Sequence, residues 1–527
     1  MRKTLWLILI AIICIAFTSA CNKVKSLMNT DDGMQLADAE FASSEEDETC
    51  DYVDVLANIP EFNTEEYKKI EENRFMSVAV SPLSTFGADV DTASYSIFRR
   101  KINHGESVRG ISLRAEEMIN YFHYDYPDPK AGEPFSVTTE ITTCPWNEKT
   151  KLMQVGFQTH KLSAEEMPTS NIVFLLDTSG SMHDEDKLPL LKSSLINMLP
   201  DMSADDRISI VTYASDQKLL LDGASPVVNR SDIVNALSQL QSGGYTEGGR
   251  GIQMAYEVAE KNFIKGGNNR IILGTDGDLN VGLTSESELQ KLVEEKRKSG
   301  VFLTVLGFGI GNLKDNKMET LADYGNGSYH YIDTILEARK VLVDERSQTL
   351  FVAAKDVKFQ VEFNPAKIKG YRLIGYESRK LNAEDFADDK KDAGEVGAGH
   401  QVTVLYELVE AGSDVEVAAV DTKYQKPEIV PSDEWLTVNV RYKEPTGTES
   451  KLLSYPVGES SLRTSMSANM SMAAAIAEVN MIANDSPNKG TSSYDGALEL
   501  LKNVDIVNDP YRAEFKALIE KLKGYDK

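Results

Sequence analysis

From Ser170 onward, short apolar runs alternate with stretches in which apolar residues recur at every third or fourth position. Such runs suit strands that are covered on both faces, and the helical period suits the helices that cover them. Strands are predicted at Ile172–Leu176, Ile208–Tyr213, Leu219–Leu221, Ile271–Gly274, Val301–Gly307 and Tyr329–Ile332. Helices are predicted at Leu188–Met198, Ile233–Leu240, Gly251–Phe263, Glu286–Lys298 and Asp315–Tyr324. The alternation favours an α/β fold with a doubly wound, mostly parallel sheet.

One predicted strand departs from this order. Leu219–Leu221 follows Tyr213 too closely for a helix to intervene, whereas parallel neighbours need a long crossover connection. We therefore expect an antiparallel strand at the edge of the sheet.

The segments on either side of this α/β region show a different order of strand-like and helical patterns. Residues 73–165 contain two helical patterns followed by alternating, strand-like stretches, which predicts a small α+β companion region. Residues 347–527 begin with strand patterns that have no helices between them and end in helical patterns. This order predicts an antiparallel sheet or sandwich with terminal helices. The α/β region between the two companions is bounded at residues 166–346.

The first residues carry the features of an export signal. Arg2 and Lys3 precede an apolar run, Leu5–Phe17, and small residues follow it up to Cys21. This pattern predicts a signal peptide at residues 1–20. The cysteine after the small residues resembles the bacterial lipobox, in which that cysteine becomes N-terminal and lipid-modified. We therefore expect Cys21 to anchor the protein in a membrane of the bacterial cell envelope, outside the cytoplasm; an ordinary cleaved signal with an incidental cysteine is the alternative.

The chain has 527 residues and a formal net charge of −26, and part of that charge is concentrated near the N-terminus. Residues 31–54 hold ten carboxylates and no lysine or arginine. Such a segment buries too little apolar surface to fold alone, so residues 21–72 are predicted to be an acidic tether behind the lipid anchor. The overall negative charge argues against a nucleic-acid partner and favours cations.

Two cysteines besides Cys21 remain in the exported chain, Cys50 and Cys144. In an exported protein they could form a disulfide that ties the tether to the folded part of the chain. Two free thiols are the alternative, because the sequence does not give the distance between the two Cα atoms.

Side chains with oxygen atoms gather at the carboxyl ends of the predicted strands, where open α/β sheets bind their ligands. Asp177 and Asp276 each follow an apolar strand, and "SGGYTEGGRGI" is a glycine-rich loop that leads into a helix. The candidate metal ligands from these three segments are Asp177, Ser179, Ser181, Thr246 and Asp276. All of them offer oxygen, which suits Mg²⁺, Ca²⁺ or Mn²⁺ and disfavours zinc or copper. Mg²⁺ is preferred because few carboxylates are offered in a compact site.

The ligand set leaves room for a ligand from another molecule. Two carboxylates neutralise a divalent ion, and neutral hydroxyls fill coordination positions without cancelling its attraction for further anions. An open position could then take a carboxylate from a protein partner. Asp278, two residues after Asp276, could orient a coordinating water or cap the following turn, and it is left outside the ligand set.

The segments "FLLDTSGSM", "SGGYTEGGRGI" and "ILGTDGDLNVG" resemble the three parts of the metal-ion-dependent adhesion site of the von Willebrand factor type A (VWA) family. The five candidate ligands match its coordinating positions without substitution. The chain from about residue 75 to 525 is similar to bacterial lipoproteins that carry such a domain between two companion regions. The resemblance implies a doubly wound domain that binds a protein through a divalent metal, with companion regions whose roles are poorly defined.

These observations predict a membrane-anchored binding protein without enzymatic activity. One alternative is an extracytoplasmic metal-dependent hydrolase, for which His183, beside three acidic residues, is the nearest candidate base. The other is a scaffold of an envelope complex in which the metal only steadies the fold. "GTDGD" and "SGGYTEGG" lack the lysine of a phosphate-binding loop, and the sequence contains no GxSxG elbow. Nothing in the sequence predicts the oligomeric state.

Overall fold

The computed structural model describes residues 70–525, except for 89–90, 164, 246–247, 278–285, 311–314, 390, 392, 419–428 and 446. The predicted signal peptide, Cys21, Cys50 and nearly all of the acidic tether lie outside this part of the chain, as do Thr246 and Asp278. What the sequence predicts for them stays a prediction. Within the described residues, no helix combines the length and the apolar character needed to cross a membrane.

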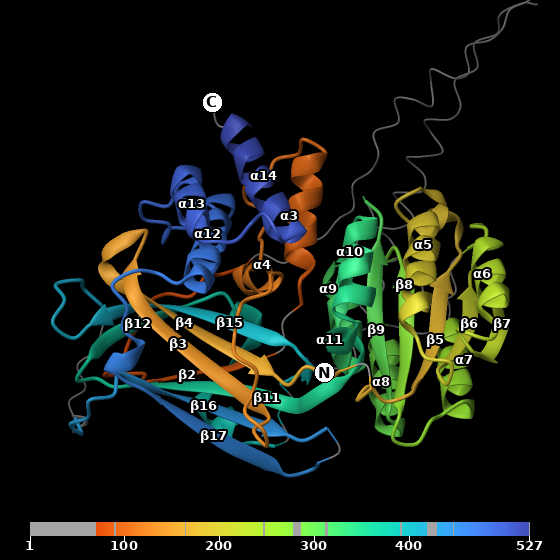
Figure 1. Cartoon of the computed structure of the whole chain (residues 1–527), viewed down its shortest axis with the longest axis horizontal. Coiled ribbons are helices and arrows are strands. Elements are labelled where there is room, and N and C mark those ends of the chain that lie inside the picture. Colours follow the sequence, from red (N-terminus) through yellow and green to blue (C-terminus); the bar gives the residue numbers. More distant parts are fainter. Residues whose placement is uncertain are drawn as a thin grey trace, which may run out of the picture. The chain divides into compact units, whose positions relative to one another are not determined.

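The α/β region contains a six-stranded sheet with the strand order β10-β9-β8-β5-β6-β7 (Figure 1). Its strands are β5 (Ser170–Asp177), β6 (Arg207–Tyr213), β7 (Gln217–Ala224), β8 (Asn268–Thr275), β9 (Val301–Phe308) and β10 (Tyr329–Ile332). All neighbouring pairs are parallel except β6 with β7, which are antiparallel at the edge of the sheet. The predicted doubly wound fold and its antiparallel edge strand are confirmed.

Helices cover both faces of this sheet. They are α5 (Leu188–Met198), α6 (Arg230–Ser238), α7 (Gly248–Lys261), α8 (Glu286–Lys296), α9 (Asp315–Tyr324), α10 (Ile335–Arg339) and α11 (Arg346–Leu350). Along β5, Val173 and Leu175 pack with α7 and α9, while Phe174 and Leu176 pack with α5 on the opposite face. Because alternate residues of a strand enter different cores, β5 is apolar from Ile172 up to its terminal aspartate.

The remaining strands form two antiparallel sheets. The first has the order β1-β12-β15-β4-β3 and the second the order β13-β2-β11-β16-β17, with β14 paired to β11. Their bounds are β1 (Met76–Ser77), β2 (Leu83–Gly87), β3 (Phe135–Cys144), β4 (Asn147–Thr159), β11 (Val352–Phe363), β12 (Ile368–Ile374), β13 (Lys380–Leu381), β14 (Glu395–Gly397), β15 (Gln401–Glu410), β16 (Leu436–Lys443) and β17 (Ser450–Val457). The sheets share one core, in which the rings of Phe157 on β4 and Phe359 on β11 lie 5.2 Å apart.

This pairing corrects the division of the flanking segments into two separate companion regions. β4 precedes the α/β domain and pairs with β15, which follows it, and β2 pairs with β11 in the same way. The segments 73–165 and 347–527 therefore build one β-sandwich, from which the α/β domain is a long insertion. Local periodicity shows that a strand forms but carries no information about its distant partner strand.

Helices from both ends of the described chain cover the outer face of the first sheet. They are α3 (Ala93–Asn103), α4 (Ala115–Asn120), α12 (Ala468–Ala483), α13 (Tyr494–Leu500) and α14 (Pro510–Tyr525). Their shared core includes Leu152 of β4 and Leu405 of β15, and the rings of Phe122 and Phe515 lie 5.3 Å apart within it. Cys144 is part of this core as a free, fully buried thiol, whose pKa is raised by burial. The predicted disulfide with Cys50 stays a prediction, because Cys50 lies outside the described residues.

Candidate functional site

The candidate site begins at Asp177, the last residue of β5, whose side chain is fully buried. The backbone N–H of Ser179 donates to its Oδ1 at 2.9 Å. The hydroxyls of Tyr213 and Thr275 donate to its Oδ2 at 3.1 and 3.2 Å. Burial raises the pKa of Asp177 to about 6, and the nearby charge of Asp276 acts in the same direction. The carboxylate is therefore held in a fixed orientation in a place that favours a neighbouring positive charge.

The two serines of this turn bring their hydroxyl oxygens within 3.0 Å of each other. Ser179 is buried, whereas Ser181, inside a short 3₁₀ helix (Gly180–His183), is exposed. Alternate side chains of the turn thus lie together, as their spacing predicts. The exposure of Ser181 places the open side of the oxygen cluster at the surface of the domain.

Asp276 follows the neighbouring strand β8 and is 1 % exposed. Since β5 and β8 pair in parallel, with Leu176 opposite Gly274, the two aspartates lie at adjacent carboxyl ends. The ammonium of Lys187 lies 3.4 Å from Oδ2 of Asp276 and donates to the carbonyl oxygen of Ser181 at 2.8 Å. A lysine of the protein itself thus lies beside this carboxylate.

The glycine-rich segment lies against the same turn. The N–H of Gly180 donates to the carbonyl of Gly244 at 3.0 Å, and the N–H of Gly243 donates to the carbonyl of Thr178 at 2.8 Å. Gly244 has φ +84°, and a Cβ atom there would lie 2.6 Å from Oγ of Ser215, so this position requires glycine. Thr246 follows two residues later and lies outside the described residues, so the structure brings together four of the five predicted ligands.

The residues present fit a hard divalent cation. The described ligands are two buried carboxylates and two hydroxyls, without sulfur or imidazole. The charge of Asp276 adds to the effect of burial on the pKa of Asp177, and a divalent cation between the two carboxylates would relieve their repulsion. His183 is exposed, and its Nδ1 lies 3.3 Å from Oγ of Ser242 at the rim of the site.

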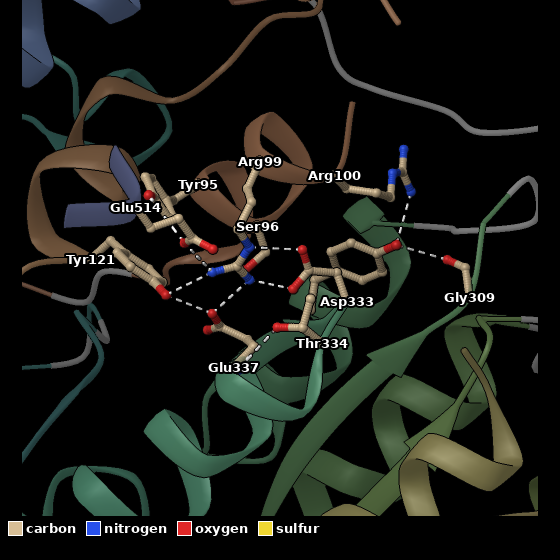
Figure 2. Close-up of polar contacts among 11 residues, drawn as sticks. Tyr95, Ser96, Arg99, Arg100, Tyr121, Gly309, Asp333, Thr334, Glu337 and Glu514 are labelled. Atoms are coloured by element: carbon tan, nitrogen blue, oxygen red, sulfur yellow. Dashed lines mark hydrogen bonds and ion pairs between the residues drawn. The ribbon is translucent and has the colours of Figure 1, made fainter. Parts of the chain in front are cut away.

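A second group of buried carboxylates joins the α/β domain to the helices of the companion region (Figure 2). Asp333 directly follows β10, and Glu337 lies in α10. Arg99 of α3, which is 1 % exposed, donates from Nε to Asp333 and from Nη2 to Glu337, at 2.8 Å each. Its Nη1 donates to the hydroxyl of Tyr121 and to Glu514 of α14 at 3.0 and 3.1 Å. One arginine thus connects the domain with three helices of the companion region.

A third carboxylate group, Asp91, Glu117 and Glu319, brings its oxygens within 4.8 Å of one another. Two arginines form ion pairs with all three carboxylates of this group. Arg114 pairs with Glu117 and Glu319 at 2.7 and 3.0 Å, and Arg379 pairs with Asp91 and Glu319 at 3.1 and 3.2 Å. The group therefore forms a further ion-pair network between the α/β domain and its companion, and it does not suit a metal ion.

Comparisons with known proteins agree with this architecture. The pattern of the von Willebrand factor type A domain matches residues 171–342, a pattern described as von Willebrand factor matches 61–154, and one described as "Uncharacterized protein YfbK, C-terminal" matches 348–524. The uncharacterized protein YfbK of Escherichia coli (strain K12) is 40 % identical over 475 residues, which cover 88 % of this chain and 81 % of that protein. The chain belongs to the YfbK family.

Two further similarities cover parts of this YfbK-family chain. Inter-alpha-trypsin inhibitor heavy chain H3 of Bos taurus is 31 % identical over 184 residues, or 33 % of this chain and 20 % of that protein. The chain thus spans about a fifth of the length of that relative. A solved structure, von Willebrand factor type A from Catenulispora acidiphila, aligns with 75 % of this chain and 91 % of its own at 14 % identity and a TM-score of 0.41. VWA domains are typically protein-binding modules rather than enzymes.

Three residues that support the site in this YfbK-family chain were not found from the sequence. Tyr213 and Thr275 end the strands beside β5 and orient Asp177, and Lys187 opens the helix that follows the serine turn. The first two stand at strand ends, where ligand sites of open sheets form, and that position was the available signal. Lys187 had no such signal, because a lysine after three acidic residues reads as part of a solvated loop.

Proposed function

We propose that this protein is anchored in the bacterial cell envelope, outside the cytoplasm, through lipid-modified Cys21 and captures a protein partner by means of a divalent cation. The proposed ligands are Asp177, Ser179, Ser181, Thr246 and Asp276. The observation that carries the proposal is the pair of buried aspartates at adjacent strand ends, combined with two neighbouring hydroxyls, of which that of Ser181 is exposed. A bound Mg²⁺ would supply the positive charge that holds a carboxylate of the partner.

The contacts of the site support this function. Three donors hold the Asp177 carboxylate, so its orientation is set before any cation binds. Hydrogen bonds to Gly243 and Gly244 fix the first loop against the glycine-rich segment. A rigid site of this kind lowers the entropy cost of capturing a partner. Mg²⁺ is proposed over Ca²⁺ because the site is compact and offers few carboxylates.

Calorimetric titration of the full-length chain with MgCl₂ tests the cation site. We expect binding of one Mg²⁺ by the wild type and a loss of affinity of about 100-fold or more in Asp177→Ala, because a ligand and its negative charge are removed. Asp205→Ala is the control, since Asp205 is an exposed carboxylate of the same domain that precedes β6, at the end of the strand opposite the site. Equal affinities for wild type and Asp177→Ala would contradict the assignment.

Capture of the partner needs its own experiment. Crosslinked pull-downs from native envelopes, with and without a chelator, should recover a protein only when Mg²⁺ is present and Asp177 is intact. Equal capture under all conditions would reject metal-mediated binding. Equal capture combined with Mg²⁺ binding in the titration would support the alternative scaffold, in which the metal only steadies the fold.

The lipid anchor and the absence of catalysis are tested separately. Mass spectrometry of the mature N-terminus should show a lipid adduct on Cys21, and Cys21→Ser should move the protein to the soluble fraction. A panel of esters and phosphoesters should show no turnover. Turnover that is lost in His183→Ala would favour the hydrolase instead.

A further inference from the structure

Arg270 is a buried cation at the end of the sheet opposite the aspartate site. It lies near the start of β8 and is 2 % exposed. Strand alternation places it on the same face as Ile272, which belongs to the core beneath α5. A charged side chain on an otherwise apolar face needs a compensating group, because desolvation of an ion is costly.

The hydrogen bonds of Arg270 go to neutral oxygen atoms. Its Nη1 donates to Oγ1 of Thr304 at 2.7 Å, and its Nη2 donates to the carbonyl of Leu350 at 3.3 Å. Its Nε has no hydrogen-bond partner, and no described carboxylate forms an ion pair with its guanidinium. By contrast, the equally buried Arg372 pairs with Glu407 at 2.8 Å. Burial lowers the pKa of Arg270 to about 10, and the opposing effect of the charge of Glu395 is smaller.

Arg270 lines a cavity of about 70 Å³ where the VWA domain meets the β-sandwich. The cavity is also lined by Ser328 and His330 from the domain, and by Glu395 and His400 from the sandwich. Nε2 of His330 lies 2.9 Å from Oγ of Ser328, while its buried Nδ1 has no partner. Two unused polar groups, Nε of Arg270 and Nδ1 of His330, thus belong to residues that line one small cavity.

The two carboxylates that line the cavity are occupied by other groups. Glu345 pairs with Lys340 and lies 3.0 Å from Nε2 of His123. Glu395 accepts a hydrogen bond from Nδ2 of Asn326 at 2.8 Å. Their presence nevertheless disfavours a ligand with several negative charges, because like charges repel strongly at low dielectric.

We propose that this cavity binds a small, singly charged anion of the carboxylate class, which accepts hydrogen bonds from Nε of Arg270 and Nδ1 of His330. A carboxylate offers two acceptor oxygens, one for each of these two donors. The cavity has space for a few waters or one anion of the size of acetate. Because its walls come from both the domain and the sandwich, the bound anion connects the two. This site is independent of the proposed metal site.

Thermal unfolding of the full-length chain in sodium acetate, compared with sodium chloride at equal ionic strength, tests the site. We expect the midpoint to rise with acetate in a saturable manner, and the apparent Kd for acetate to increase at least tenfold in Arg270→Gln. Arg372→Gln is the matched control: it removes an equally buried arginine that has its own carboxylate, so it should keep the response to acetate. Equal responses of wild type and Arg270→Gln would overturn the proposal.

A second variant and a structure keep the test decisive if Arg270→Gln does not fold. His330→Leu retains Arg270 and should weaken the acetate response several-fold. A crystal structure in acetate should show the anion in contact with Arg270, whereas density for waters only would overturn the proposal. A response to phosphate or chloride that equals the response to acetate would overturn the assignment to the carboxylate class.

Discussion

Two pairs of buried carboxylates lie at the carboxyl-end edge of the same sheet, and they differ in the positively charged group that contacts them. Asp333 and Glu337 both form ion pairs with the guanidinium of Arg99, a residue that is itself 1 % exposed. The positive charge that they require is built into the protein and held by two tyrosines and a glutamate around it. This pair joins the domain to the helices of its companion (Figure 2).

Asp177 and Asp276 are equally buried, and the groups that contact them include hydroxyls, one backbone N–H and the ammonium of Lys187. Lysine is a single point charge on a flexible stem, whereas arginine is a rigid fork with several donors. The ion pairs of Arg99 with Asp333 and Glu337 thus form a fixed contact between the α/β domain and the companion helices. Asp177 and Asp276, with hydroxyl groups and a lysine 3.4 Å away, lack such a fixed arginine within the described residues, and the proposed function gives this place to a cation from solution.

The largest expected effect comes from removing the internal cation. Arg99→Met leaves Asp333 and Glu337 buried without their countercharge, so the free energy of unfolding should fall by about 3–5 kcal/mol. Urea denaturation measures this loss. Lower pH should reduce it, because protonation removes the uncompensated charges.

Two further variants show whether charge is the cause. Arg339→Met removes an arginine that is 65 % exposed and lies 3.6 Å from Asp344, and it should change the stability by less than about 0.5 kcal/mol. Adding Asp333→Asn and Glu337→Gln to Arg99→Met should recover much of the lost stability. A triple variant as unstable as Arg99→Met would indicate lost packing rather than lost charge.

Glu478 extends the comparison to a buried carboxylate for which the described residues provide neither an ion pair nor a hydroxyl donor. It is 3 % exposed on α12, its Oε2 has no hydrogen-bond partner, and burial raises its pKa to about 7. The folded protein therefore keeps this proton between about pH 4.5 and 7, while the unfolded chain loses it.

The unfolding free energy should accordingly fall as the pH rises from about 4.5 to 7, by an amount on the order of 3 kcal/mol from this group. It should not change further above pH 7 on account of Glu478. Glu478→Gln should remove this dependence and be more stable than the wild type at pH 8. Parallel pH profiles for the two proteins would show that Glu478 does not titrate in this range.

The sequence predicted that Asp177, Ser179, Ser181 and Asp276 lie close together, but it did not predict the contacts of Arg99, because only the former depend on local patterns. Each candidate ligand stands in a short segment whose own pattern marks a strand end or a glycine-rich loop. The strand Val301–Phe308 ends one residue beyond its predicted end, because an apolar run between helices defines its own limits. The edge strand Gln217–Ala224 is longer than predicted, since none of its residues is fully buried and its flanks are polar.

The ion pairs of Arg99 with Asp333 and Glu337 could not be predicted from local patterns. Arg99 lies in "SYSIFRRKIN", where adjacent basic residues are typical of an exposed helix face. Its partner Asp333 is 234 residues away, and no local pattern reports such a contact. The same limit applies to the sandwich, whose strands pair across the whole inserted domain.

The smallest expected effect tests whether Lys187 plays a different role at Asp276 from that of Arg99 at Asp333 and Glu337. Lys187→Met removes the ammonium that lies 3.4 Å from Asp276, which should lower the metal-free stability by about 1–2 kcal/mol. The same change should tighten Mg²⁺ binding by about tenfold, because the cation no longer competes with the lysine. Lys192→Met is the control, since Lys192 lies in α5, the helix that Lys187 precedes, and donates to the carbonyls of Ser238 and Leu240. Weaker Mg²⁺ binding in Lys187→Met would mean that the lysine organises the site, and the contrast with Arg99 would then be lost.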